Sequence, residues 1–311
     1  MRSSSADFAR LDIRRCPVTT IHATRSTAGE HLSGARPVDE VYEVFALKYA
    51  ERGGRIRGDS FLFDDDHSSP HDIDYYIWLV RNDNRTIVVD TGYDGEEGKR
   101  RGRPILSDPA SCLAGFGIDP ASVETVIVTH LHYDHAGSLD RFPNACFHLQ
   151  AAEMAYATGP CMCHGSLNHP FSVDHVCQMV RKVYSGRVVF HDGTGLVAPG
   201  IEVHALGGHS RGLQCVRVKT NTGWLVLASD ASHYYENFRQ GKLFPIVENA
   251  EAMLEGFRRL PRLASDTKLV VPGHDPLVRQ LFPSVAESCD GTAVHRLDVG
   301  PSPTHWERLV T

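Results

Sequence analysis

At 311 residues, the chain is long enough for one large α/β domain or two smaller ones, and it can bury a sizeable core. Hydrophobic residues make up 41% and charged residues 23% of the sequence, which is ordinary for a globular protein. The formal net charge of −6 argues against a nucleic-acid partner, because proteins that bind the phosphate backbone need a basic face. The sequence contains no run of about 18 apolar residues, so we expect neither a membrane span nor a membrane partner.

The N-terminal residues 1–38 show little periodicity and predict a partly ordered extension. Its first seven residues lack the apolar core of a signal peptide. The eight cysteines are scattered through a chain of medium size, which favours reduced, mostly structural thiols over a disulfide framework. Together these features predict a cytoplasmic protein.

The first half of the chain predicts strands joined by loops and short helices. A β-rich run spans residues 41–47, and the runs 75–80 and 86–90 bracket an Asn/Asp linker that is typical of a hairpin. The acidic stretch 64–72 predicts a solvated loop rather than a cation site. Further strands are expected at 123–128 and 146–149, and helices at 108–117, 151–156 and 171–184.

The second half repeats the alternation of strand and turn. Strands are expected at 187–190, 201–206, 213–218, 224–228 and 268–271, and an amphipathic helix at 250–260. In the helix expected at 171–184, Val173, Val176, Val180 and Val183 follow helical spacing and predict a core face. Strand-rich halves with helices predict two packed sheets covered by helices on the outside.

Residues 159–169 form an irregular stretch that contains Cys161, Cys163 and His164. Pairs of metal-binding cysteines normally have about two to four residues between them, and this pair has a single one. The stretch therefore favours a loop or lid near an active site over a second metal site.

One stretch, Val-Thr-His-Leu-His-Tyr-Asp-His-Ala-Gly at residues 128–137, concentrates side chains that bind metals. His130, His132, Asp134 and His135 follow an apolar β-branched run that predicts a buried strand. Neutral imidazoles together with a carboxylate favour zinc or a similar first-row ion. The density of these residues favours a metal site over a hydrogen-bonded polar turn.

Three later turns each place a further metal-binding side chain directly after a strand, at His209, Asp230 and His274. Glycines beside the two histidines allow tight turns and a close approach of the imidazoles to an ion. Asp90, in an Asp-Thr-Gly turn at another strand end, could orient a ligand histidine or form an Asx-type turn.

With these residues in place, the chain from about 40 to 285 resembles the metallo-β-lactamase-fold superfamily of hydrolases. The resemblance implies an α+β fold, an αββα sandwich of two mixed sheets, and two divalent ions such as zinc. It divides the chain into an extension (1–38), a catalytic domain (39–288) with an insertion or lid at 157–185, and a C-terminal tail (289–311). In the ligation pattern of this family, His130, His132 and His209 hold one ion, Asp134, His135 and His274 hold the other, and Asp230 bridges them.

Within the superfamily, residues 130–137 and 230–238 are most similar to the N-acyl-homoserine lactonases. Those enzymes usually carry a catalytic tyrosine three residues after the bridging aspartate, and this chain has His233 there. Tyr234 or Tyr235 could take that role, or His233 itself could donate a hydrogen bond to the developing oxyanion.

The resemblance implies a hydrolase that opens a small lactone by attack of a hydroxide shared by two metal ions, which lower the pKa of bound water. Asp134 is the expected proton carrier to the leaving alkoxide, and His233 with Tyr234 the expected oxyanion donor. The partner implied is a small-molecule lactone or ester, and a homodimer is an open option for the assembly.

Two alternatives stay open. One is a hydrolase of another ester, a cyclic amide or a thioester, similar to glyoxalase II. The other is a non-enzymatic protein that holds a structural zinc, which is disfavoured because seven ligands exceed the need of one ion.

Overall fold

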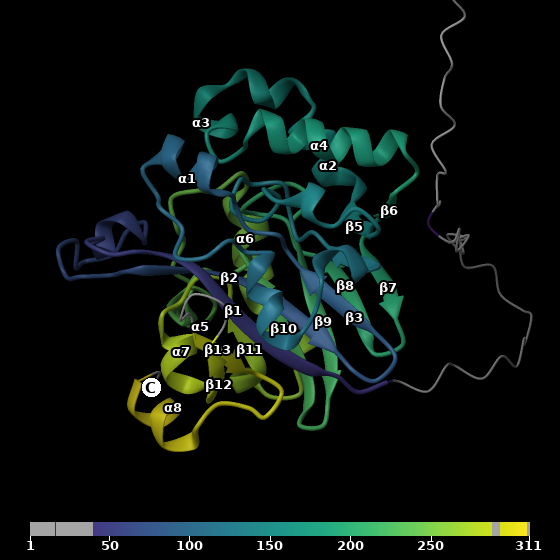
Figure 1. The fold of residues 1–311 in the computed structure, drawn as a ribbon. Coiled ribbons are helices and arrows are strands. Elements are labelled where there is room, and N and C mark those ends of the chain that lie inside the picture. The colour runs from purple at the N-terminus through teal and green to yellow at the C-terminus, as the bar shows by residue number, and fades with distance from the viewer. Residues whose placement is uncertain (1–15, 17–39, 288–292, 310–311) are drawn as a thin grey trace, which may run out of the picture.

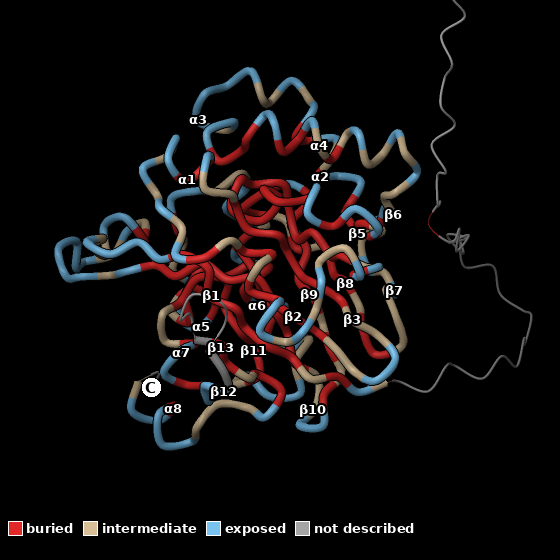
Figure 2. Tube along the Cα trace, viewed as in Figure 1, coloured by how far each residue is buried: buried red, intermediate tan, exposed pale blue. Residues whose placement is uncertain are grey.

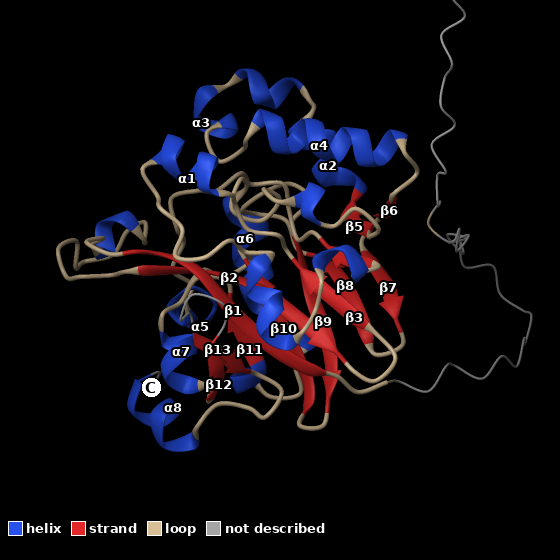
Figure 3. Cartoon of the chain, viewed as in Figure 1, coloured by secondary structure: helices blue, strands red, loops and turns tan. Residues whose placement is uncertain are grey.

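The computed structural model describes residue 16, residues 40–287 and residues 293–309. Two β-sheets pack against each other, with helices around them (Figure 1, Figure 3). One sheet has eight strands in the order β12-β13-β1-β2-β3-β4-β5-β6, and the other has five in the order β11-β10-β9-β8-β7. This arrangement confirms the predicted α+β sandwich.

The strands of the larger sheet are β1 (Glu43–Arg52), β2 (Ile73–Arg81), β3 (Thr86–Val89), β4 (Thr125–Ile127), β5 (Cys146–Gln150), β6 (Val188–His191), β12 (Ser284–Glu287) and β13 (Ala293–Arg296). The smaller sheet contains β7 (Thr194–Ala198), β8 (Ile201–Ala205), β9 (Gln214–Thr220), β10 (Gly223–Ser229) and β11 (Val270–Pro272). The helices are α1 (Gly95–Arg101), α2 (Ala151–Ala157), α3 (Gly165–Asn168), α4 (Val173–Tyr184), α5 (Tyr235–Gln240), α6 (Ala250–Leu263), α7 (Leu277–Leu281) and α8 (Pro303–Leu309).

The central strands of the larger sheet are buried on both faces (Figure 2). Along β2, Trp78 and Val80 face the core shared with the smaller sheet, whereas Ile77 and Leu79 belong to a second core beneath the outer helices α2 and α4. Successive strand residues point to opposite faces, so two apolar cores require an almost continuous apolar run. The run expected at 75–80 is such a strand, and its hairpin with β3 is confirmed by antiparallel pairing that ends at Arg81 and Thr86.

Helix α4 buries one face against the second core, but the predicted face was only partly right. Val176 is buried and Val180 and Val183 are half-buried, whereas Val173 is 70% exposed. Val173 is the first residue of the helix, and the buried face runs through residues 175, 176 and 179 instead. Helical spacing thus predicted the element correctly but misjudged the burial at its start.

The C-terminal region differs from the expected tail. Strand β13 pairs antiparallel with β1, with His295 opposite Ala46, and therefore belongs to the larger sheet. Trp306 of α8 packs edge-on against Tyr235, with ring centroids 5.3 Å apart. Residues 293–309 lack a long periodic run in the sequence, and their place in the fold comes from these contacts with distant parts of the chain. The extension predicted at 1–38 lies outside the described residues, apart from Cys16.

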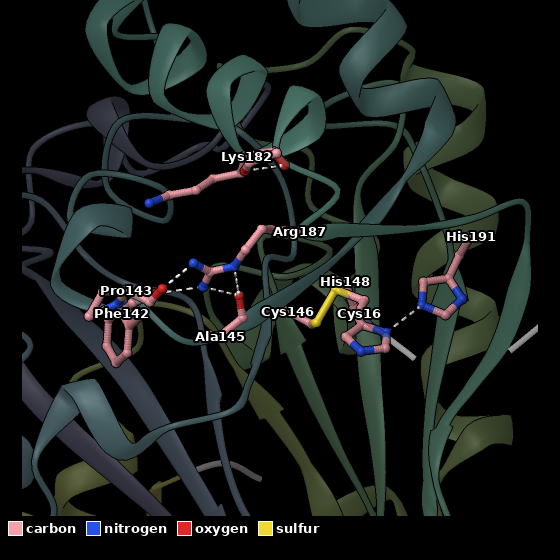
Figure 4. Close-up of a disulfide and its surroundings, with 10 residues drawn as sticks. Cys16, Phe142, Pro143, Ala145, Cys146, His148, Lys182, Arg187 and His191 are labelled. Atoms are coloured by element: carbon pink, nitrogen blue, oxygen red, sulfur yellow. Dashed lines mark hydrogen bonds between the residues drawn. A yellow bond between two sulfur atoms is a disulfide. The ribbon is translucent and has the colours of Figure 1, made fainter. Parts of the chain in front are cut away.

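The expectation of reduced cysteines is wrong for one pair. Cys16 forms a disulfide with Cys146 at the start of β5, across a separation of 130 residues (Figure 4). Such a separation leaves no local pattern in the sequence, because only the folded chain brings the two sulfurs together. The other described cysteines are free thiols. The cytoplasmic location, which depended on reduced cysteines, stays a prediction without that support.

In the part of the chain that the structure describes, no helix combines the length and the apolar character needed to cross a bilayer.

Candidate metal centre and active site

The candidate site lies where two pairs of parallel strands end. Strands β3 and β4 run parallel, as do β10 and β11, so each pair delivers the residues that follow it to one edge of its sheet. Asp90 follows β3 and the 129–135 segment follows β4. Asp230 follows β10, and His274 lies just beyond β11. The turn between β8 and β9 adds His209. Strand ends therefore position all the predicted ligands.

Asp230 occupies the centre of this group, and its two carboxylate oxygens face different histidines. Oδ1 lies 3.1 Å from Nε2 of His135 and 3.0 Å from Nε2 of His274. Oδ2 lies 3.2 Å from Nε2 of His209 and 3.9 Å from Nε2 of His130. This is the arrangement expected of a carboxylate placed between two cations.

The remaining side chains complete two sets of three potential ligands. Ligand atoms of each set lie within 4.8 Å of one another: His130, His132 and His209 form one set, and Asp134, His135 and His274 the other. The Nε2 atoms of His130, His135 and His209 are buried and have no hydrogen-bond partner among the described residues. A buried polar atom without a partner is costly, so these atoms fit a bound cation. The residues present thus fit two divalent ions.

Hydrogen bonds on the far side of the imidazoles orient three of these histidines. Nδ1 of His135 lies 2.7 Å from Oδ2 of Asp90, as the Asp-Thr-Gly turn suggested. Nδ1 of His209 lies 2.8 Å from the carbonyl oxygen of Ile246, and Nδ1 of His274 lies 2.8 Å from that of Asp74. Each bond directs Nε2 towards the centre, an arrangement common among histidines that bind metals.

Asp90 also holds the loop that carries the first histidines. Its carboxylate accepts hydrogen bonds from the backbone N–H of Thr129 at 2.7 Å and from the Thr129 hydroxyl at 2.8 Å. Asp90 has a positive φ of 60°, which is uncommon for a residue other than glycine. One carboxylate therefore connects the β3 turn to both ends of the 129–135 segment.

Close backbone approaches explain two of the glycines beside ligands. A Cβ atom at Gly208 would lie 2.5 Å from the backbone of Met253, and φ there is +87°. At Gly273, a Cβ would lie 2.7 Å from the backbone of Ser229 and 2.9 Å from Oδ1 of Asp230. Larger residues at these positions would push apart the turns that carry the ligands.

Burial and neighbouring charges act differently on the residues of the two ligand sets. Burial, reinforced by neighbouring imidazoles, holds the pKa of His130 and His132 well below the usual value, so both are neutral at pH 7. Burial acts in the same direction on His135, but Asp230 and Asp90 outweigh it and raise its pKa. For Asp230, burial favours the neutral form, yet the surrounding histidines prevail and lower its pKa well below the usual range.

A buried glutamate, missed by sequence reasoning, connects two of the ligand loops. Glu153 on α2 is fully buried and accepts hydrogen bonds from the backbone N–H groups of Leu131 and Gly212, each at 2.9 Å. It also accepts from the hydroxyl of Ser210. Leu131 lies between the first two histidines and Ser210 follows His209. The sequence carried no signal for this role, because glutamate in a first helical turn is usually exposed.

His233 lies beside the centre, as the resemblance suggested. Its Nε2 is 2.9 Å from Oδ2 of Asp230, and its ring stacks on Phe244 with centroids 3.8 Å apart. Burial, although opposed by Asp230, lowers the pKa of His233 to about 4, so the imidazole is neutral at pH 7.

Tyr234 points away from the centre, contrary to its predicted catalytic role. Its hydroxyl lies 3.3 Å from the Ser60 hydroxyl and 3.3 Å from the carbonyl oxygen of Asp72. Its ring packs on that of His71, with centroids 4.2 Å apart. In an extended backbone, consecutive side chains point to opposite sides, so His233 and Tyr234 cannot both face the ligands.

A small cavity of about 90 Å³ opens onto the ligands. Its walls include the predicted residues His132, Asp134, His209, Asp230, His233 and His274. They also include residues that the sequence analysis did not single out, namely Arg55, Tyr75, Arg101, Arg103, Tyr133 and Phe244. Tyr133 could have been noticed, because it lies inside the histidine motif.

The insertion expected at 157–185 contributes to this cavity through His169 and Pro170. Its Phe171 packs edge-on against His132, with ring centroids 4.6 Å apart. The groups of described side chains that could share a metal ion all lie around Asp230, and none includes Cys161, Cys163 or His164. The insertion thus forms part of the cavity wall.

A comparison with protein families agrees with this geometry. The model of the metallo-beta-lactamase superfamily matches residues 73–274, which span all the ligand candidates. The chain belongs to the metallo-beta-lactamase superfamily. Hydrolases of this superfamily bind divalent metals, in keeping with the two ligand sets.

Several members of the superfamily are similar to this chain. The N-acyl homoserine lactonase AttM of Azorhizobium caulinodans is 29% identical over 185 residues, which cover 56% of this chain and 67% of that protein. The N-acyl homoserine lactonase of Bacillus cereus is 25% identical over 216 residues, or 64% of this chain and 80% of that protein. A crystal structure of a quorum-quenching N-acyl homoserine lactone lactonase superposes with a TM-score of 0.63 over 78% of this chain and 95% of that chain. At 19% identity, this structural likeness concerns the fold.

Proposed function

We propose that this metallo-hydrolase binds two divalent ions and opens the ring of a small lactone. The observation that carries the proposal is the position of Asp230, whose two oxygens face separate sets of potential ligands. A structural zinc site normally needs four ligands for one ion, whereas this centre offers enough for two and opens onto a cavity. The similarity to N-acyl homoserine lactonases supports a lactone as the substrate.

The side chains of this centre have distinct tasks in the proposal. His130, His132 and His209 would hold one ion, Asp134, His135 and His274 would hold the other, and Asp230 would lie between them. Two divalent ions bound there would lower the pKa of a shared water and polarise the lactone carbonyl. The imidazoles would hold the ions at fixed positions beside the cavity.

Asp134 is the proposed proton carrier. Its two oxygens lie 3.9 Å from Nε2 of His135 and 3.9 Å from Nε2 of His274, and it also lines the cavity. A carboxylate that reaches both the ligands and the substrate can move a proton to the alkoxide that leaves when the ring opens.

His233 is the proposed hydrogen-bond donor of the site. Because its Nε2 lies 2.9 Å from Asp230, the geometry favours a bond that steadies the bridging carboxylate over one to the oxyanion. His233 then acts as a positioning residue. The hydroxyls of Tyr75 and Tyr133, whose side chains line the cavity, are the alternative donors to the oxyanion.

The cavity size favours a small substrate. Pockets that enclose drug-sized ligands typically measure about 300–1,000 Å³, several times the volume found here. A compact lactone ring with a short substituent fits this volume better than one with a long acyl chain.

Acid release from a panel of small lactones, cyclic amides and thioesters tests the proposal. The protein should be loaded with zinc, manganese or cobalt in separate preparations, and its metal content should be measured in parallel. We expect two ions per chain and turnover of lactones above that of the other classes. Hydrolysis of thioesters alone, or one ion per chain in an inactive protein, would contradict the lactonase proposal.

A further inference from the structure

The wall of the active-site cavity carries charged side chains of both signs. Three arginines line it, Arg55, Arg101 and Arg103, together with three aspartates. Of the aspartates, Asp134 and Asp230 face the histidines and would be compensated by bound cations. The charge balance of the rest of the wall therefore depends on the arginines and on Asp59.

One of these arginines has a structural role. The guanidinium of Arg101 pairs with the buried carboxylate of Glu97. Its other nitrogens donate to the carbonyl oxygens of His169 and Phe171, each at 2.9 Å. These bonds engage all three guanidinium nitrogens and hold the insertion in place, so the charge of Arg101 is already paired with Glu97.

The other two arginines have no ion-pair partner within 4 Å among the described residues. Arg103 donates to the hydroxyl of Tyr133 and lies over its ring, 5.3 Å from the centroid. Arg55 donates to the carbonyl oxygen of Asp59 at 2.7 Å, while its Nε is buried without a hydrogen-bond partner. The Asp59 carboxylate accepts from the backbone N–H of Ile56 at 3.1 Å instead.

The two arginines share the cavity wall with Tyr75, which lies beside the centre. Tyr75 packs edge-on against His274, with ring centroids 5.1 Å apart. Arg55, Arg103 and Tyr75 thus line the same small cavity as His274 of the second ligand set.

We propose that Arg55 and Arg103 form an anion-binding subsite, so that the preferred substrate is a small lactone that carries a carboxylate. This inference rests on the proposed lactonase function and narrows its substrate class. Guanidinium groups bind carboxylates through charge-assisted hydrogen bonds, and both arginines line the cavity without an ion-pair partner among the described residues. Ring opening adds one water across the acyl C–O bond and yields a hydroxy dicarboxylate, while the carboxylate held by the arginines is unchanged.

Two lactones that differ in charge alone test the proposal. The probes are 5-oxotetrahydrofuran-2-carboxylate and the corresponding carboxamide, compared by kcat/KM with metal-loaded protein. We expect the carboxylate to be preferred by at least about 10-fold, mainly through KM, because charge-assisted hydrogen bonds are worth roughly this factor or more. Arg55→Gln and Arg103→Gln should each remove most of this preference, read as the ratio of kcat/KM between the two probes.

Control variants separate charge from structure. Arg103→Lys keeps the charge and should retain part of the preference, whereas Arg258→Gln, on the exposed face of α6, should retain all of it. Metal content and thermal unfolding should be measured for each variant. If Arg103→Gln does not fold, Arg55→Gln alone decides the matter. Equal kcat/KM for the two probes, or a preference unchanged in both Gln variants, would overturn the proposal.

A binding measurement distinguishes failure of this inference from failure of the lactonase proposal. Pyroglutamate and its amide are analogues in which a lactam replaces the lactone, and calorimetry can compare their binding without turnover. We expect pyroglutamate to bind at least about 10-fold more tightly, and Arg55→Gln and Arg103→Gln to abolish the difference. If neither lactone is hydrolysed but this difference is found, the anion subsite stands and the lactonase proposal falls. If both variants still prefer pyroglutamate, its carboxylate binds the metal ions and not the arginines, and the anion subsite is refuted.

Discussion

The buried carboxylate of Glu153 accepts a hydrogen bond from the hydroxyl of Ser210, whose Oγ lies 2.8 Å and 2.6 Å from the two carboxylate oxygens. This contact joins α2 to the turn that carries His209. Since Glu153 also accepts from the backbone N–H of Leu131, it holds loops from both halves of the chain at a fixed separation. A residue that binds no ion thereby helps to define the geometry of the ligands.

Glu153→Ala should lower both stability and metal retention. The substitution leaves the N–H groups of Leu131 and Gly212 buried without an acceptor, which costs about 1–3 kcal/mol for each group. We expect a loss of at least about 2 kcal/mol in the free energy of unfolding, measured by chemical denaturation, and easier removal of metal by a chelator. Glu255→Ala, at an exposed position of α6, is the matched control. Unchanged metal retention would show that α2 does not hold the ligand loops together.

Asp230→Asn should reduce metal occupancy and turnover together. The amide offers a single, neutral oxygen where the carboxylate presents one oxygen to each ligand set. Loss of an orienting residue behind a ligand typically costs about 10–100-fold, so loss of the central ligand should cost at least about 100-fold in turnover. Metal analysis and lactone hydrolysis measure the two effects. Asp140→Asn, at an exposed surface position, should affect neither. Full activity with two ions bound would exclude Asp230 as the bridge.

His233→Ala should lower kcat by about 10-fold while KM and metal content change little. The reason is that Nε2 of His233 lies 2.9 Å from Asp230 and steadies its carboxylate. Removal of His233 leaves Asp230 and the six other proposed ligands in place. His233→Gln, which can still donate a hydrogen bond, should recover part of the loss. Two results would be incompatible with this role: an unchanged kcat, or loss of one ion from the purified variant.

Acid should destabilise the protein partly through His148. Burial, with a smaller contribution from His191, lowers the pKa of His148 from 6.5 to about 3. Nδ1 of His148 lies 2.9 Å from Nε2 of His191 (Figure 4). Between pH 6.5 and about 3 the unfolded chain binds a proton at this residue and the folded chain does not. Stability should therefore fall as the pH falls through this window, by up to about 1.4 kcal/mol per pH unit.

His148→Gln should reduce that dependence by about 2 kcal/mol between pH 6.5 and pH 5, measured by urea denaturation at both values. His67→Gln, in an exposed loop, serves as the control. An identical pH dependence in wild type and His148→Gln would refute the assignment of the buried neutral imidazole.

Removal of the disulfide should lower stability. Cys16→Ser frees a loop closed across 130 residues, and loss of such a cross-link typically costs about 2–4 kcal/mol in the free energy of unfolding. Reduction of the wild type should reproduce the effect, whereas the reductant should leave Cys16→Ser unchanged. Cys177→Ser, at an exposed free thiol, is the control. If reduction leaves the denaturation midpoint of the wild type unaltered, the cross-link does not constrain the unfolded chain.

Much of the fold and of the ligand set could be predicted from the sequence, because both depend on local patterns. A buried strand leaves an apolar run, and a ligand in the turn after it lies next to that run. One short stretch after a strand therefore contains four of the candidate ligands, His130, His132, Asp134 and His135. The other three also follow strands and could be picked out in the same way: His209, Asp230 and His274. The ion that each side chain binds stays a prediction.

Tertiary structure decided what depends on contacts between distant segments. No periodic pattern in the sequence predicts three of these features: the disulfide between Cys16 and Cys146, the buried acceptor Glu153, and the cavity arginines Arg55 and Arg103, which lack an ion-pair partner among the described residues. Helical spacing likewise could not reveal the exposure of Val173, nor could a motif reveal the direction of Tyr234. Local sequence determines which elements form and which turns follow them, whereas strand register and packing determine which side chains then share a buried space.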